Sequence, residues 1–150
     1  MAELRDRVAA ELENVEKTLR EIPAASRCPS LSPLELAGVA ALLHNFYNGI
    51  ENILKQVLQS RSVPIPTGDS WHRDLLALAA EERILRRATV DALKRYLAFR
   101  HFFSHAYALD LAAPRMEALV ADVNKVFEAF NQDTAAHLAP PPPPTTSTST

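Results

Sequence analysis

Helical periodicity extends through almost the whole of this 150-residue chain. Apolar residues recur three or four positions apart, which is the spacing of one face of an α-helix, and no strand-like alternation lasts more than a few residues. The first apolar stripe consists of Leu4, Val8, Leu12, Val15, Leu19 and Ile22. Amphipathic helices bury such stripes by packing against one another, so the pattern predicts an all-α fold.

Capping and helix-breaking residues set the expected limits of the first two helices. The first is expected over residues 2–21, and a proline-containing connector follows over residues 23–30. The second helix begins sharply, because Ser32 and Glu35 form a capping box with a proline at the first helical position. The prolines and glycine of the segment SVPIPTGD end it after about Ser60.

Three further helices complete the expected bundle. A short helix covers the segment SWHRDLLALAA and is capped by Asp69 or Ser70. The next helix is expected over residues 89–107, and the last begins at Pro114. The predicted architecture is therefore a bundle of four main helices and one short helix, joined by short loops.

The C-terminal residues differ in composition from the rest. Five consecutive prolines are followed by threonine and serine alone, and such a low-complexity segment cannot form a core. We therefore expect one helical domain over residues 1–132 and a disordered tail over residues 133–150.

Charge, cysteine content and hydropathy exclude several broad classes. The formal net charge of -2 argues against a general nucleic-acid coat protein, which would be broadly basic. The single cysteine, Cys28, can form no internal disulfide and fits a reducing compartment. The most apolar segment, residues 34–43, is shorter than the roughly 20 residues that cross a bilayer. We therefore expect a soluble cytoplasmic protein.

The segment FRHFFSHAY places titratable and cationic groups inside an otherwise apolar helix. Arg100 falls on the apolar stripe, where a guanidinium needs an anionic partner or a water-filled cleft. His105 lies five residues further on, about 140° around an ideal helix. The two side chains share a cleft if the helix ends near His105 or if a second subunit supplies one of them. Apolar residues on almost every side of this helix favour a dimer interface.

Positive charge is concentrated around this segment. Residues 86–105 contain five arginine and lysine side chains and one aspartate, although the chain as a whole is acidic. A patch of this kind attracts a polyanion. The structural alternative is that Arg100 pairs with a buried carboxylate and that the aromatic residues simply form core.

A metal site is a further interpretation of the two histidines. His101 and His105 are four residues apart, the spacing of two ligands on one helix face. No HExxH glutamate, further cysteine or obvious carboxylate joins them, so we expect no metal.

The chain has only three glycines and lacks a phosphate-cradling glycine loop, so we expect no cofactor either.

A second polar stripe lies on the second helix. It consists of His44, Asn48, Glu51 and Lys55, which are three or four residues apart. One interpretation is a solvated helix face. The other is a wall of an RNA cleft, in which Glu51 orients or pairs with Arg100. Trp71 and His72, in the short helix, are expected to be packing and helix-cap residues rather than base-stacking ones.

Arg100, His105 and Tyr107 have the spacing of the RxxxxHxY motif, and here the chain resembles HepT-like toxins of the HEPN group of all-α ribonuclease domains. The segments SWHRDLL and HNFYNGIENIL also resemble sequences of this family. The resemblance covers roughly residues 34–130 and leaves the proline-rich tail outside.

The resemblance implies an activity and an assembly. Members of the family are similar to metal-independent endoribonucleases in which the motif helices meet at a homodimer interface and form a composite site. Arg100 would then hold and neutralise the scissile phosphate, because a guanidinium matches phosphate oxygens. His105 would act as general base or acid, since histidine titrates near neutral pH.

Four residues are auxiliary or phosphate-binding candidates: His101, Ser104, Glu51 and His44. In related toxins a polar residue such as asparagine often follows the motif arginine, whereas this chain has His101. That histidine is either a second acid/base group or an outward-facing surface residue. Ser104 is either a phosphate ligand or a donor to its own helix backbone.

The resemblance also implies a partner. HepT-like toxins are commonly paired with a minimal nucleotidyltransferase (MNT-type) antitoxin, which in some pairs transfers AMP to the motif tyrosine. Tyr107 occupies that position, and a bulky anionic group there would block the phosphate pocket; its alternative role is plain packing. The expected partners are RNA, this antitoxin and a second copy of the chain, with no DNA and no membrane. The alternative function is a non-catalytic HEPN module that binds a nucleotidyltransferase or a nucleotide.

Overall fold

Each described element of secondary structure is a helix. The computed structural model of the chain describes residues 2–105 and 111–138. In chain order the elements are α1 (Ala2–Glu21), the 3₁₀ helix η1 (Ala25–Ser30), α2 (Pro33–Ser60), α3 (Trp71–Glu81), α4 (Arg87–His105) and α5 (Ala113–Leu138). The expected all-α class is confirmed for these residues, and the expected connector after α1 contains η1. Within the same ranges, no helix combines the length and the apolarity that a membrane span requires.

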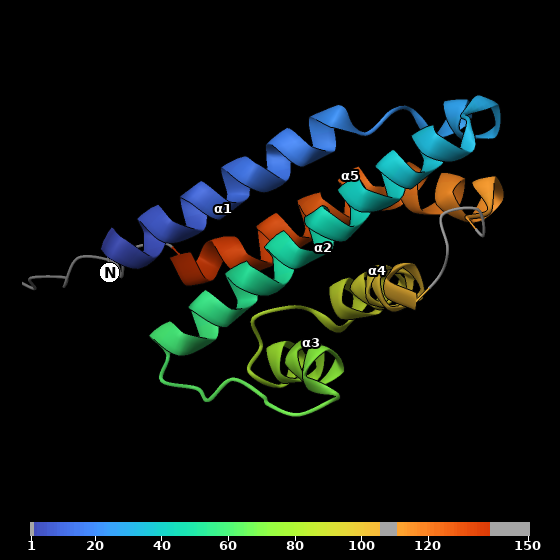
Figure 1. Ribbon diagram of the computed structural model, residues 1–150. Helices are drawn as coiled ribbons and strands as arrows, with labels where there is room; N and C mark the ends of the chain where they lie inside the picture. The colour runs from blue at the N-terminus through green and yellow to red at the C-terminus, as the bar shows by residue number, and fades with distance from the viewer. Residues whose placement is uncertain (1, 106–110, 139–150) are drawn as a thin grey trace, which may run out of the picture.

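Helix α2 is the central element and contacts each of the other four α-helices. Figure 1 shows α1, α2 and α5 running alongside one another, whereas α3 and α4 are seen almost end-on beside α2. Thirteen of the 28 residues of α2 are buried, which is what a helix with neighbours on several sides requires. Side chains of α2 can therefore meet groups from α1, α3 and α4.

The N-terminus of α2 has the predicted capping box. The backbone N–H of Glu35 donates to the Ser32 hydroxyl at 3.1 Å, and the backbone N–H of Ser32 donates to the Glu35 carboxylate at 2.9 Å. These two bonds satisfy N–H groups that an α-helix leaves unpaired at its start. Hydrogen bonding of the Glu35 carboxylate to Ser32, first of all to the Ser32 backbone N–H, lowers the pKa of Glu35.

The C-termini of α2 and α3 end in the same motif without a glycine. Ser62 has φ 58° and Arg83 has φ 59°, both in the left-handed region. After α3, the N–H of Arg83 donates to the Ala80 carbonyl at 3.1 Å and the N–H of Ile84 to the Ala79 carbonyl at 2.9 Å. This is the Schellman arrangement, in which glycine is usual because it tolerates positive φ. The end of α2 at Ser60 is where the segment SVPIPTGD predicted it, whereas the Schellman geometry of the two ends was not predicted.

The start of α3 differs in detail from the expectation. Ser70 is the N-cap residue, as one of the two alternatives predicted, but its side chain makes no capping bond to the backbone. Its hydroxyl donates instead to the Asp74 carboxylate at 2.9 Å. The Ser70 hydroxyl is therefore bonded to the Asp74 side chain in the first turn and not to a backbone N–H of the helix.

The last two helices extend beyond their expected starts, and α5 beyond its expected end. Helix α4 begins at Arg87 and is described as far as His105, so Tyr107 lies outside the described residues. Helix α5 continues to Leu138, past residue 132, where the tail was expected to begin. Thr134 explains the extra turns, because it is buried and its hydroxyl donates to the Phe130 carbonyl at 2.9 Å.

Aromatic side chains hold α4 against α2 and α5. The Tyr96 hydroxyl donates to the carbonyl of Leu119 in α5 at 2.6 Å, and the Tyr96 ring packs edge-on against Phe46 of α2. Phe99 is only 1% exposed. Helices α2, α3 and α5 all pack against α4, so this helix is buried on more than one side within the single chain. The motif helix is thus firmly positioned up to Phe99.

Candidate functional site

Arg100 extends from α4 to α2 and is held there by an amide. Its Nε donates a hydrogen bond to Oδ1 of Asn48 at 3.2 Å, and the side chain is half-buried. Among the described residues, no carboxylate oxygen lies within 4.0 Å of its nitrogens. The alternative in which Arg100 pairs with a buried carboxylate is therefore wrong for this part of the chain. Its positive charge is oriented but not neutralised.

Asn48 also connects Arg100 to His44. The Asn48 amide nitrogen lies 3.3 Å from Nδ1 of His44. Because an amide nitrogen only donates, Nδ1 is the acceptor and a neutral His44 carries its proton on Nε2. Burial lowers the pKa of His44, and the Arg100 guanidinium lowers it further. The His44 ring packs against Phe103 of α4 with 5.5 Å between centroids, so this side of α4 is fixed by both polar and apolar contacts.

Glu51 pairs with His72 of α3 rather than with Arg100. The Glu51 side chain is buried, and its Oε2 lies 2.7 Å from Nδ1 of His72. A carboxylate only accepts, so Nδ1 carries the proton. The expectation that Glu51 pairs with Arg100 is wrong because His72 already occupies the carboxylate. The interpretation of the α2 stripe as a solvated face is also wrong at this residue.

Tyr47 lies close to the charged groups of Glu51 and Arg100, and the sequence did not identify it as a site residue. Its hydroxyl is buried and has no hydrogen-bond partner among the described residues. Burial raises the pKa of Tyr47 and the Glu51 carboxylate raises it further, whereas the Arg100 guanidinium lowers it. Tyr47 falls among the apolar positions of α2, so periodicity alone marks it as core. The i, i+4 distance from Tyr47 to Glu51 is the only signal in the sequence that links them.

Trp71 of α3 contacts both Lys55 of α2 and the neighbouring His72. The Lys55 ammonium lies 4.0 Å from the centre of the Trp71 ring, and the Trp71 and His72 rings are 3.6 Å apart. A cation over an indole face is a favourable contact. Trp71 is therefore covered by Lys55 on one face, which supports its predicted role in packing.

Among the residues that the structure describes, His105 forms its hydrogen bond within its own helix. Its Nδ1 lies 2.8 Å from the backbone oxygen of His101, and both side chains are exposed. A carbonyl oxygen only accepts, so this bond places the proton on Nδ1 and leaves Nε2 with a free lone pair. The two imidazole rings are 4.6 Å apart. Within the described ranges, no group of three histidine, cysteine or acidic side chains could hold a metal ion.

Ser104 and Tyr107 complete the motif region. The Ser104 hydroxyl donates to the Arg100 carbonyl at 2.9 Å, which is the helix-backbone alternative predicted for it. Tyr107 lies outside the described residues. Among those that are described, no hydrogen bond or ring contact joins Arg100 to His105. The single chain therefore presents them as two separate groups.

The positive patch is smaller in the fold than in the sequence. Arg86 pairs with Asp133 at 2.7 Å, and Arg95 with Asp122 at 2.8 Å; both aspartates come from α5. Lys94 lies 3.6 Å from Asp91 on its own helix. Three of the five basic side chains are thus paired, two of them with carboxylates of α5 that are remote in sequence. Arg100 differs from these three in having no such partner in the described part of the chain.

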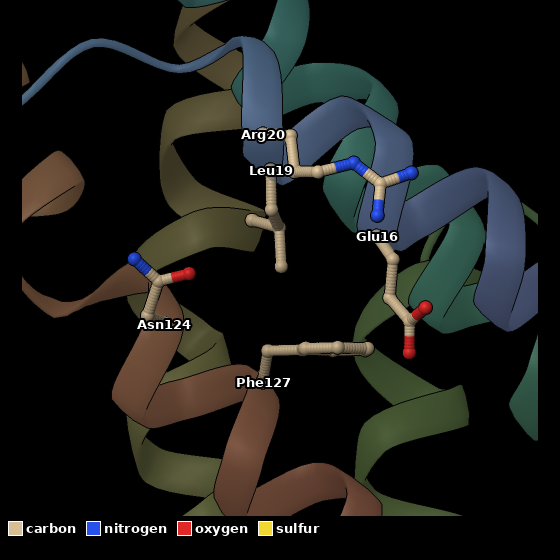
Figure 2. A pocket seen from close by; sticks show the side chains of 5 residues that line it. All are labelled: Glu16, Leu19, Arg20, Asn124 and Phe127. Carbon is tan, nitrogen blue, oxygen red and sulfur yellow. The ribbon is translucent and has the colours of Figure 1, made fainter.

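A cavity of about 420 Å³ lies between α1 and α5, apart from these residues. Figure 2 shows Leu19 and Phe127 facing each other across it, with Glu16 and Arg20 on the side of α1. None of the described candidate residues of the motif lines it. The predicted site residues therefore gather along α2 and α4 instead.

The described residues form an all-α bundle, which is consistent with a HEPN-like domain. A family model described as HepT-like protein matches residues 38–139, which is more than half of the chain. The chain belongs to the HepT-like protein family. Comparisons with curated proteins and with solved structures gave no match. The matched region includes most of α2 and all of α3 and α4, and thus the candidate site residues on these three helices.

Proposed function

We propose that this chain is the toxin of a toxin–antitoxin pair and that it cleaves RNA as a homodimer without a metal ion. The main observation in favour is the state of Arg100, whose guanidinium is oriented by Asn48 at 3.2 Å and has no carboxylate within reach in the described residues. A cation that serves only stability is normally paired when it is half-buried. An oriented and unpaired guanidinium is suited to an incoming phosphate.

Arg100 would bind the scissile phosphate and stabilise the negative charge that develops on its oxygens. The Nε atom is engaged by Asn48, which leaves the two terminal nitrogens of the guanidinium for phosphate. Such a preorganised cation typically contributes about 10²–10³ to the rate. His44 would stay neutral beside it and add no competing positive charge, in line with its lowered pKa.

His105 would exchange the proton of the reaction. Its Nε2 is the free nitrogen, because Nδ1 is bonded to the His101 carbonyl. The neutral ring accepts a proton from the ribose 2′-hydroxyl, or the protonated ring donates one to the leaving oxygen. His101, which is next to His105 in space, is the candidate for an auxiliary acid/base role.

A second copy of the chain would unite the two groups. In one chain Arg100 points to α2 and His105 is exposed at the end of the described part of α4. A twofold axis beside α4 would place His105 of each subunit near Arg100 of the other. Phe102 and Phe103, half-buried in the single chain, would complete their burial in such an interface.

The proposed antitoxin is a minimal nucleotidyltransferase that transfers AMP to Tyr107. The modified side chain would add a phosphate two residues from His105. Negative charge at that position would repel the substrate phosphate and fill the space beside the histidine. This part of the proposal predicts a gain of AMP mass on wild type and none on Tyr107→Phe.

Degradation of RNA in the presence of EDTA tests the proposed activity. Wild type should cleave, whereas Arg100→Ala and His105→Ala should lose about 10²–10⁴ in rate while remaining folded dimers. Arg87→Ala, an exposed arginine in the first turn of the same helix, is the matched control and should cleave normally. Cleavage that survives both motif variants, or no cleavage by wild type, would favour the non-catalytic binding module.

A further inference from the structure

A small polar groove lies between α1 and α2, beside the proposed phosphate site. Its volume is about 250 Å³. Four of the six asparagines of the chain line it: Asn14 from α1 and Asn45, Asn48 and Asn52 from α2. Asn14, Asn45 and Asn52 are exposed, so their amides face solvent. Such a concentration of carboxamides is not needed for packing, because surface helix positions favour charged and long side chains.

The close approach of the two helices shapes this groove. Figure 1 shows α1 and α2 side by side along their length. Gly49, at the base of the groove, has no side chain, and a Cβ atom there would lie 2.4 Å from Cγ2 of Val15. Since real Cβ contacts are longer than this, only glycine permits this packing. The amides on either side of Gly49 are thereby brought close to those of α1.

The lining matches an uncharged polar ring better than a phosphate. Among the described residues, no lysine or arginine lines the groove, and Glu11 is the one charged residue that does. A carboxamide offers both a donor and an acceptor, the pairing that reads base edges in nucleic acids. The volume is below the range of about 300–1,000 Å³ that holds a drug-sized ligand, which suits one heterocycle rather than a whole nucleotide.

Asn48 connects this groove to Arg100. It lines the groove and also accepts the hydrogen bond from Arg100 Nε at 3.2 Å. A ligand that places a phosphate on Arg100 therefore has the amide groove immediately beside it on the surface of α2. Proteins that recognise single-stranded RNA bind unstacked bases by hydrogen bonds to their edges in this way.

We propose that the groove between α1 and α2 binds one base of the RNA whose phosphate is held by Arg100, and that it prefers a base with an exocyclic amino group. This inference rests on the proposed function, since it assumes an RNA substrate at Arg100. The preference follows from Glu11, because a carboxylate accepts from an amino group such as N4 of cytosine and repels the carbonyl oxygen that uracil has there.

The groove is tested without relying on cleavage by measuring the affinity of the full chain for CMP and for UMP, with NMR or calorimetry. Wild type should bind CMP roughly tenfold more tightly than UMP, the effect of one satisfied hydrogen bond. Asn45→Ala and Asn52→Ala should each weaken CMP binding by several-fold to about tenfold. Glu11→Gln should bring the two affinities together, and Arg100→Ala should weaken both nucleotides equally. Asn124→Ala, on α5, is the control and should bind as wild type does.

Cleavage of RNA with cytidine-rich and uridine-rich segments separates this inference from the proposed function. Arg100-dependent cleavage with an unchanged base preference in Asn45→Ala, Asn52→Ala and Glu11→Gln would overturn the groove and leave the ribonuclease proposal intact. Selective CMP binding that these variants abolish, in a protein that cleaves no RNA, would support the groove and overturn the ribonuclease. Equal binding of CMP and UMP by wild type would overturn the base preference.

Discussion

Arg100 and His105 stand on the same helix, but their surroundings differ. Arg100 is fixed from outside its helix, by Asn48 of α2, which is itself bonded to His44. Among the described residues, His105 is exposed and its hydrogen bond is to the backbone of its own helix, one turn back. In the proposed site, one chain therefore fixes the phosphate-binding group, whereas the proton-transfer group has a defined tautomer and no hydrogen bond to another described helix. A composite site between two chains would combine these two groups.

Mixing two inactive variants should give the largest effect. Arg100→Ala and His105→Ala should each lose about 10²–10⁴ in rate. If each site combines groups from two chains, a mixed dimer retains one intact site. Co-refolding the variants in equal amounts should then recover about one quarter of wild-type activity, since half of the dimers are mixed. Recovery is measured with the same RNA and EDTA as above. An inactive mixture in which mass spectrometry detects mixed dimers would place both groups in one chain.

Removal of His72 should have the largest effect on stability. His72→Ala leaves the Glu51 carboxylate buried without its partner at 2.7 Å. An uncompensated buried charge typically costs about 3–5 kcal/mol, and partial exposure of His72 places the expected loss at the lower end, about 3 kcal/mol. Urea unfolding measures the change in the free energy of unfolding. His72→Gln keeps a donor and should lose less; equal losses would show that the imidazole contributes by packing alone.

Two glycines of α2 should respond in opposite directions to the same substitution. Gly49→Ala introduces the contact with Val15 and should destabilise by about 1–3 kcal/mol, because α1 must move away. At Gly38 a Cβ would meet nothing within 4 Å, so Gly38→Ala should stabilise by about 0.5–1 kcal/mol. Thermal unfolding of both variants gives the comparison. A stabilising Gly49→Ala would contradict the close packing.

The smallest expected effect is a pH dependence of the free energy of unfolding, which comes from His44 beside Arg100. The pKa of His44 is lowered in the folded state by burial and by Arg100, so the unfolded chain binds more protons in mildly acidic solution. Stability should therefore rise with pH toward about 7 and fall as the pH drops below the unfolded value of about 6.5. Urea unfolding from pH 5 to 7 measures this slope, and His44→Gln should reduce it. An unchanged slope would show that other groups, such as His137, account for it.

Much of the fold followed from local signals. The range of α1, the capping box of α2 and the short α3 were predicted from residues that act within a few positions of one another. The ends of α2 and α3 in Schellman turns were less accessible, because Ser62 and Arg83 do not have the conformational freedom that makes glycine a signal. The extra turns of α5 depended on the burial of Thr134 against the rest of the bundle.

By itself, the sequence determined the helical class, the family motif and the presence of Arg100 and His105 on one helix. These properties depend on periodicity, capping and spacing, which act along the chain. The partners of the charged groups were decided by the tertiary structure alone. Glu51 pairs with His72, and the α5 aspartates pair with Arg86 and Arg95, while the amide of Asn48 is the partner of Arg100 within the described part of the chain. Electrostatic pairing depends on distance in space, and residues remote in sequence become neighbours only when helices pack.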